Sequence, residues 1–88
     1  MQLDKTEVEN EIKAYLYLAI EKTDSELLNI QATAKDVFSE FSHLKLKEIN
    51  EAIRLGGLGK YGRTYKLTTQ EVMMWIREYL KSKKSKLL

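Results

Sequence analysis

Apolar residues recur at steps of three and four along most of the chain, which is the spacing of one helical face. The first stripe follows Asp4, which has Glu7 three residues later in the arrangement of a capping box. The pattern predicts a helix over about residues 5–21. The apolar residues of this face are Val8, Ile12, Tyr15, Leu16 and Ala19.

A second stripe follows Thr23, which has Glu26 at capping-box spacing. The stripe thins over residues 31–33, so the chain up to about residue 42 forms one helix or two shorter ones, and we favour one. A third stripe predicts a helix over about residues 45–55. We expect Gly56 and Gly57 to end it, because glycine readily adopts the left-handed conformation found just past a helix. The two stripes are Leu27, Ile30, Ala34, Val37, Phe38 and Phe41, and then Leu46, Ile49, Ala52 and Ile53.

The last helix has the clearest start. Thr68 and Glu71 form a capping box, and Leu67 and Val72 occupy the positions of a hydrophobic staple. Its apolar face continues through Trp75, Ile76, Tyr79 and Leu80. Beyond it, lysine and serine residues predict a basic flexible tail over residues 81–88. No alternation of period two is long enough for a sheet, although residues 61–67 could form a short extended segment.

The fold class predicted from these patterns is all-α. We expect a small bundle of four to five helices in a single domain over residues 1–80, because a chain of 88 residues is short for more than one core. A connector rich in glycine and tyrosine joins the last two helices. Residues 54–66, around this connector, hold all four glycines, four basic residues and no acidic residue.

Three of the glycines match the dinucleotide fingerprint G-x-G-x-x-G: Gly57, Gly59 and Gly62. That motif binds pyrophosphate only where a strand precedes it and a helix opens directly from it. Here a predicted helix precedes it, and the next helix starts near Thr69. We therefore reject a dinucleotide site. A P-loop is excluded as well, because Lys60 lacks the following Ser or Thr.

Charge is distributed unevenly along the chain. Residues 1–53 carry 6 Lys and Arg against 11 Asp and Glu, a net charge of −5, whereas residues 54–88 carry 9 against 2, a net charge of +7. The basic half predicts an anionic partner, nucleic acid first, whose phosphates lysine and arginine neutralise. The alternative is that the two halves attract each other or that the basic tail is only solvated. The candidate phosphate-binding residues are Arg54, Lys60, Arg63, Lys66, Lys81, Lys83 and Lys84.

Aromatic and sulfur-containing side chains add two candidate contact surfaces. Tyr61 and the nearby Tyr65 could stack on bases or pack over the bundle, and packing is the stronger expectation for Tyr65. Met73, Met74 and Trp75 widen the apolar face of the last helix, which indicates either core or a protein interface with a partner or a second copy.

Several classes of function are not expected. The chain has no cysteine, which excludes disulfides, thiolate catalysis and cysteine-bound metals. His43 is the only histidine, and no second residue has metal-ligand spacing to it, so we expect a surface or capping role and no metal. No nucleophile–base pair is evident, so we expect a non-enzyme without cofactor or small-molecule substrate. The absence of a long apolar run predicts a cytoplasmic protein with no membrane partner.

About 35 residues, centred on the connector, resemble a segment of small proteins from Bacteroidetes phages and mobile elements. That family's pattern is G-x-x-G-K-Y-G-x-x-Y followed by a helix containing W-[IL]-x-x-Y. It corresponds here to Gly56, Gly59, Lys60, Tyr61, Gly62 and Tyr65, and then to Trp75, Ile76 and Tyr79. The chain departs from the family after Tyr65, where the family often has an Asp-Gly turn. The resemblance implies an accessory factor linked to phage or plasmid DNA replication, with no known activity to transfer.

The leading hypothesis is a non-catalytic DNA-associated accessory protein that contacts phosphates without reading sequence. A helix-turn-helix reader ranks lower, because the turn before the last helix would be far longer than three or four residues. The alternative class is an adaptor or inhibitor that docks on a larger phage or host protein through the last helix. A minor virion component is a third reading.

Overall fold

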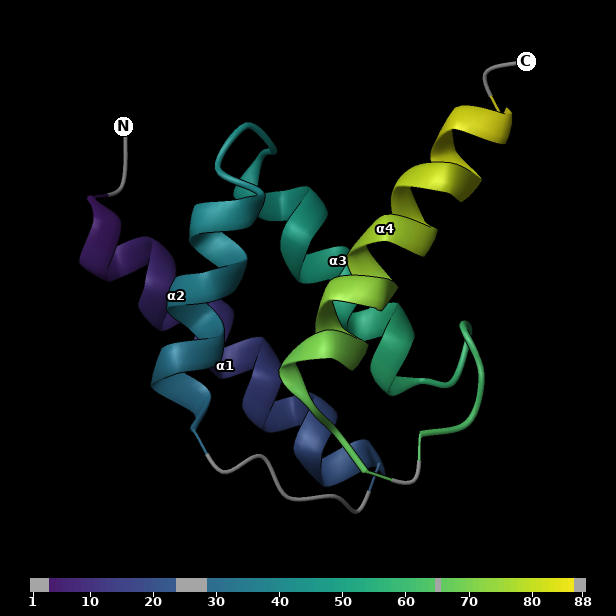
Figure 1. Cartoon of the computed structure of the whole chain (residues 1–88), viewed down its shortest axis with the longest axis horizontal. Helices are drawn as coiled ribbons and strands as arrows, with labels where there is room; N and C mark the ends of the chain where they lie inside the picture. Colours follow the sequence, from purple (N-terminus) through teal and green to yellow (C-terminus); the bar gives the residue numbers. More distant parts are fainter. Residues whose placement is uncertain (1–3, 24–28, 65, 87–88) are drawn as a thin grey trace.

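The computed structural model describes residues 4–23, 29–64 and 66–86, and the side chains of residues 4–23, 29–64 and 66–83. It contains four helices: α1 (Lys5–Thr23), α2 (Ile30–Glu40), α3 (Leu46–Gly57) and α4 (Thr69–Lys86) (Figure 1). All regular secondary structure in these ranges is helical. The predicted all-α class is therefore confirmed, and the described part of residues 61–67 forms no strand.

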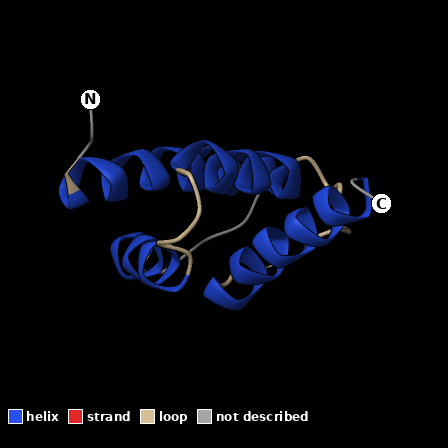
Figure 2. Ribbon diagram, turned by 90° about the horizontal axis from the view of Figure 1, so that it is seen from above, coloured by secondary structure: helices blue, strands red, loops and turns tan. Residues whose placement is uncertain are grey.

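The helices form two layers. α1 packs against α3 within one layer, and α2 packs against α4 within the other. Contacts between α1 and α2 and between α3 and α4 join the layers, as the view from above shows (Figure 2). The molecule is consequently flat, with extents of 36 × 36 × 18 Å.

The core lies between the two layers and is built from the predicted stripes. All of its largest members, including Trp75, Ile12 and Leu16, have no exposed surface or almost none. Two polar residues, Thr33 and Asn50, are buried with them, and the Thr33 hydroxyl lies 2.8 Å from the hydroxyl of Thr69. The apolar core consists of Ile12, Leu16, Ala19, Ala34, Val37, Phe41, Ile49, Ala52, Ile53, Leu67, Val72, Trp75 and Ile76.

Two of the predicted helix starts are confirmed by their capping bonds. The Asp4 carboxylate accepts a hydrogen bond from the Glu7 amide at 2.8 Å, and the Thr68 hydroxyl accepts one from the Glu71 amide at 3.2 Å. Each side chain satisfies an amide that has no partner within its own helix. The beginnings of α1 and α4 therefore follow from local sequence.

The predicted start at Thr23 is wrong. Thr23 is the last residue of α1, and its hydroxyl donates to the carbonyl of Ala19 at 2.8 Å. The described part of α2 begins at Ile30, where the Asn29 side chain accepts from the amide of Ala32 at 3.0 Å. Residues 24–28, which carry the other predicted capping residue and the first apolar residue of that stripe, lie outside the described residues.

The end of α3 also differs from the prediction. Gly56 and Gly57 do not end the helix in a left-handed conformation; they are its last two residues. Gly59 has that role, with φ = +85°. Its amide donates to Gly56 O at 3.0 Å, and the Lys60 amide donates to Leu55 O at 3.1 Å, which is the Schellman pair of bonds.

Gly56 and Gly57 instead let α3 approach both neighbouring helices. A methyl group built on Gly56 would overlap the indole ring of Trp75 on α4, at Cδ2. A methyl group on Gly57 would lie 3.3 Å from the Cα of Ala19 on α1. The double glycine therefore supports the α3–α4 contact with one residue and the α1–α3 contact with the other.

α4 is longer than predicted. Residues 81–86, expected to belong to a flexible tail, continue the helix to Lys86. An ion pair joins Lys83 on this extension to Glu48 on α3. A second one joins Arg77 to Glu40 on α2 at 4.0 Å. Lysine is a good helix former, so this polar segment needs no apolar stripe to remain helical.

We predict that Gly56→Ala lowers the free energy of unfolding by about 2–3 kcal/mol, because the new methyl group overpacks against Trp75. An ordinary glycine-to-alanine change inside a helix has the opposite sign and stabilises by about 0.5–1 kcal/mol. Urea denaturation followed by circular dichroism measures the difference.

The matched control is the same change in a Trp75→Leu background. Removing the ring removes the overlap, so Gly56→Ala should cost little or should stabilise there. An equal cost in both backgrounds would show that Trp75 is not the reason for glycine at position 56.

Candidate nucleic-acid interface

The connector between α3 and α4 begins with two successive turns. The Schellman bonds end α3 at Gly59, and the amide of Gly62 then donates to Gly59 O at 3.2 Å. Both glycines have positive φ, +85° and +112°, which other residues adopt at a cost of about 1–2 kcal/mol. The turns therefore fix the backbone on either side of Lys60 and Tyr61.

The three glycines of the dinucleotide-like match all have structural roles. Gly57 packs on α1, Gly59 ends α3, and Gly62 completes the second turn. The element before them is the helix α3, and α4 begins only at Thr69. The strand and the directly following helix that a pyrophosphate site requires are both missing from this described stretch.

Tyr61 packs against the core and is half-buried. Burial raises the pKa of its phenol, and the neighbouring Tyr79, Glu51 and Glu78 raise it further. Of the two alternatives predicted for this residue, the structure shows it mainly as a packing residue. Tyr65 lies outside the described residues.

Three of the predicted phosphate-binding residues are paired with carboxylates. Arg54 donates to both oxygens of Glu51, from Nε at 3.0 Å and from Nη2 at 2.6 Å. Lys81 lies 3.6 Å from Glu78, and Lys83 pairs with Glu48. The hydrogen bond from Arg54 lowers the pKa of Glu51, and the one from Lys83 lowers the pKa of Glu48, so both carboxylates remain charged.

The connector cations are arranged differently. Lys60, Arg63 and Lys66 are exposed, and no carboxylate of the described residues lies within ion-pair distance of Lys60 or Lys66. Lys22, the penultimate residue of α1, is brought next to Gly57 by the α1–α3 contact. Sequence reasoning missed Lys22, because it lies in the acidic half and only packing brings it to the connector.

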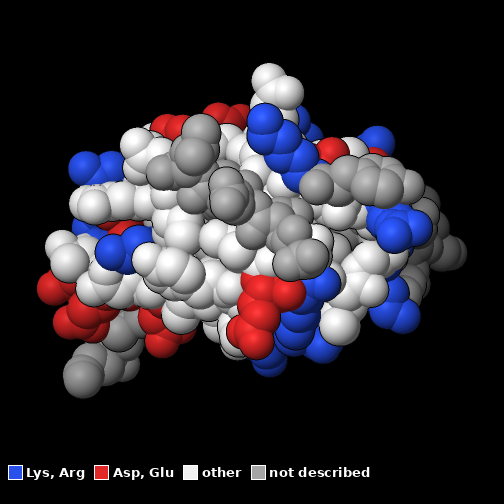
Figure 3. Space-filling model, turned by 90° about the horizontal axis from the view of Figure 1, so that it is seen from below, with Lys and Arg blue, Asp and Glu red and all other residues white. Residues whose placement is uncertain are grey.

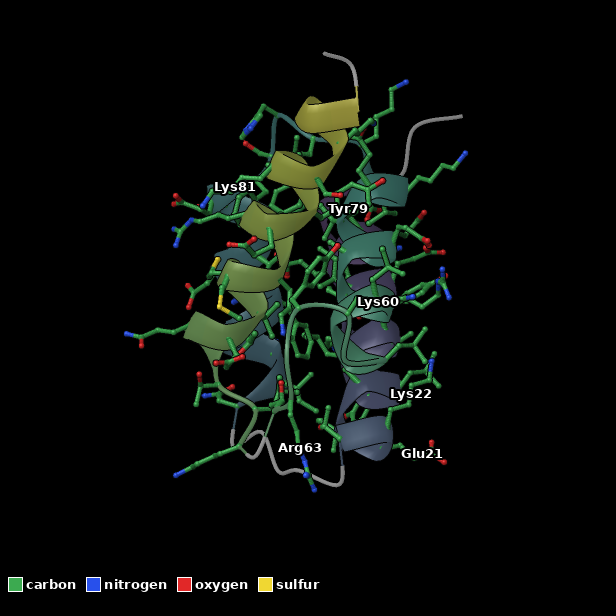
Figure 4. All side chains as sticks on the ribbon, turned by 90° about the vertical axis from the view of Figure 1, so that its right-hand side faces the viewer. Glu21, Lys22, Lys60, Arg63, Tyr79 and Lys81 are labelled. Atoms are coloured by element: carbon green, nitrogen blue, oxygen red, sulfur yellow. The ribbon has the colours of Figure 1, made fainter. Side chains whose placement is uncertain are left out.

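The side-chain view separates the predicted cations (Figure 4). Lys22 and Lys60 lie on the side of α1 and α3, Arg63 lies at the lower end of the molecule, and Lys81 lies on the opposite side, on α4. The structure therefore brings Lys22 next to the start of the connector, where it lines one cavity with Arg63, and it leaves Lys81 apart from them. The Lys84 side chain lies outside the described set.

A cavity of about 280 Å³ opens between the ends of α1 and α3 and the connector. Its lining includes Lys22, Arg63 and Thr64, and no acidic residue is among the described residues that line it. The Thr64 hydroxyl is buried without a hydrogen-bond partner in the structure. From below, acidic side chains are prominent at the left and at the lower centre, and basic ones are spread over the left, centre and right (Figure 3).

The predicted protein interface needs one correction. Trp75 has 0% exposure and lies over Gly56, so it belongs to the core and presents no surface to a partner. Met73 and Met74 are half-buried and pack against the core from outside. Of these three predicted interface residues, only the two methionines remain candidates for contact with another protein.

Within the described ranges, no group of three or more His, Asp or Glu side chains could hold a metal ion. His43 is exposed, and its ring centroid lies 6.4 Å from that of Phe41.

None of the helices that the structure describes is long and apolar enough to cross a membrane.

Comparison of the chain with protein-family models, curated proteins and solved structures gives no match. The function must therefore be argued from the residues themselves.

We predict that ionisation of Tyr61 contributes to alkaline unfolding. In an unfolded chain its phenol titrates near a pKa of about 10, and burial raises the pKa in the folded state. The folded protein therefore binds this proton more tightly, so stability falls as the pH rises from about 10 toward the raised value. Tyr61→Phe should lessen the loss of stability between about pH 9 and pH 11.

Urea denaturation at several pH values measures this loss, with Tyr17→Phe as the control because Tyr17 is exposed. If both variants lose stability with pH as the unchanged protein does, Tyr61 is not a buried titrating group.

Proposed function

We propose that the protein is a non-catalytic, DNA-associated accessory factor that contacts the phosphate backbone through the connector and the adjacent end of α1. The observation that supports this most is the set of exposed cations Lys22, Lys60, Arg63 and Lys66 around a connector without acidic residues. Three of them belong to the connector, and the α1–α3 contact brings Lys22 next to Gly57 at its start. Arg54, Lys81 and Lys83, already paired with carboxylates, contribute less.

The two turns of the connector favour this role physically. A backbone fixed by the Schellman bonds and by the Gly59–Gly62 turn holds Lys60 in place, so less conformational entropy is lost on binding. Lysine and arginine bind phosphate without reading bases. Tyr61, half-buried, is less suited to stacking than an exposed ring. Binding without sequence preference follows.

The resemblance of the connector to small proteins of Bacteroidetes phages and mobile elements extends the proposal. We place the protein in the cytoplasm, as an accessory factor for DNA replication in such an element. This extension rests on the resemblance alone, whereas DNA contact rests on the arrangement of charge.

The salt dependence of binding tests the proposal. Four cations on duplex DNA predict that the logarithm of the binding constant falls with the logarithm of salt concentration with a slope of about −3 to −4. Lys60→Gln/Lys66→Gln removes two of them and should reduce the slope by about 2. Fluorescence anisotropy with a labelled duplex at several salt concentrations measures both slopes.

The matched control is Lys5→Gln/Lys35→Gln, which removes the same charge at exposed positions of α1 and α2. This variant should keep the slope of the unchanged protein. No binding at low salt, or an equal effect of the two variants, would contradict the proposed interface.

A second candidate is an adaptor or inhibitor that docks on a larger protein through α4. The partly exposed Met73 and Met74 favour it, because methionine adapts to varied apolar partners. Capture of one defined partner that Met73→Ser/Met74→Ser abolishes, without measurable DNA affinity, would favour this candidate over the first.

A further inference from the structure

A groove lies between α3 and the C-terminal half of α4. Near one end of the contact between these helices, Gly56 lies against the ring of Trp75. Near the other end, Glu48 pairs with Lys83. The two helices therefore run antiparallel, and the groove extends from near the first of these contacts to the second.

Two hollows make up the groove, one of about 320 Å³ and one of about 170 Å³. Tyr79 and Lys83 line both hollows, so the two adjoin. Tyr61, from the connector, lines the smaller one. Sites for small ligands usually measure about 300–1,000 Å³. The groove is therefore of a size for one small chemical group and is too small for a helix.

Two tyrosine rings line the smaller hollow. Tyr61 and Tyr79 are half-buried and pack against the core, and both also border the hollow. A ring that the core already holds in place loses little conformational entropy when a ligand contacts it. A single half-buried ring stacks less well than an exposed one, but two rings at one hollow form a joint aromatic surface.

The free charge of the groove is positive. Glu48 and Glu51 are the acidic residues of its described lining, and ion pairs with basic residues already neutralise both. Lys45 and Lys47 are exposed, and no carboxylate of the described residues lies within ion-pair distance of either. The lining therefore favours a ligand that combines a flat apolar part with negative charge.

The groove is continuous with the candidate DNA contacts. Lys60 directly precedes Tyr61 in the connector. Seen from the side of Figure 4, Tyr79 lies between α3 and α4, and Lys60 lies further down the same side of the molecule. A nucleic-acid strand held by Lys60 thus passes the opening of the groove.

We propose that this groove takes an unpaired base of single-stranded DNA. The base contacts Tyr61 and Tyr79, and neighbouring phosphates lie near Lys60 at one end and near Lys45 and Lys47 at the other. In a duplex each base is paired and stacked, and taking one out costs free energy that a single strand does not lose. The inference rests on the proposed DNA contact and adds the form of DNA that the protein prefers.

A strand without bases tests this inference. Fluorescence anisotropy compares a short labelled oligothymidine with an abasic strand of the same length. Both strands carry the same phosphates, so the contacts of the connector cations are equal for the two. Contact of one base with aromatic rings should make the oligothymidine bind about tenfold more tightly at the same salt concentration.

Substitutions at Tyr79 locate the base. Tyr79→Leu keeps an apolar side chain but removes the ring, so the two strands should bind equally well. Tyr79→Phe keeps the ring and should keep the tenfold preference. Tyr17→Leu changes an exposed tyrosine that lines neither hollow, and this matched control should also keep it. Duplex affinity should be the same in all three variants, because a duplex presents no unpaired base, and circular dichroism confirms that each is folded.

The outcomes separate this inference from the proposed function. Equal affinity of the unchanged protein for the two strands overturns the inference and leaves the phosphate contacts in place. A preference for bases that survives in folded Tyr79→Leu also overturns it, because the base then lies elsewhere. No binding of duplex or single strand at low salt contradicts the proposed DNA contact itself. Capture of a defined protein that Tyr79→Leu releases, without DNA affinity, would assign the groove to a protein segment instead.

Discussion

The contact between Gly56 and Trp75 is the interaction on which the rest of the structure depends. The largest buried side chain of the protein lies directly over a residue without one, and this brings α3 and α4 together across the two layers. Aromatic rings bury more surface than other side chains, so a small core relies heavily on its single tryptophan. Gly57, next along the chain, permits the equally close approach of α1.

The same pair of glycines determines where the candidate DNA contacts lie. Because α3 ends against both α1 and α4, the connector starts at the point where three helices meet. The Schellman bonds and the following turn then direct Lys60 outward, and the α1–α3 contact adds Lys22 from the acidic half. Packing thus places a cation from the acidic half of the chain beside the start of the basic connector. Arg54, near the end of α3, is instead paired with Glu51.

Much of the fold could be predicted from local sequence. Apolar spacing identified the core stripes, and the Asp4 and Thr68 caps were readable because each depends on residues only three positions apart. The helix start predicted at Thr23 was wrong, because the Thr23 hydroxyl donates to the carbonyl of Ala19 instead of capping the next helix. Gly56 and Gly57 were mistaken for a helix stop because sequence cannot show that Trp75 and Ala19 pack against them. Lys22 was not predicted as a phosphate contact, because the sequence alone cannot show that α1 packs against Gly57.

The most direct test of this account is the proton chemical shift of Gly56 Hα in the folded protein. The hydrogen that replaces a side chain at Gly56 faces the indole ring of Trp75, so the ring current should move its resonance strongly upfield. The shift should return to an ordinary glycine value in Trp75→Leu. An unshifted Gly56 resonance in the folded, unchanged protein would show that the ring does not lie over Gly56, and it would contradict the account.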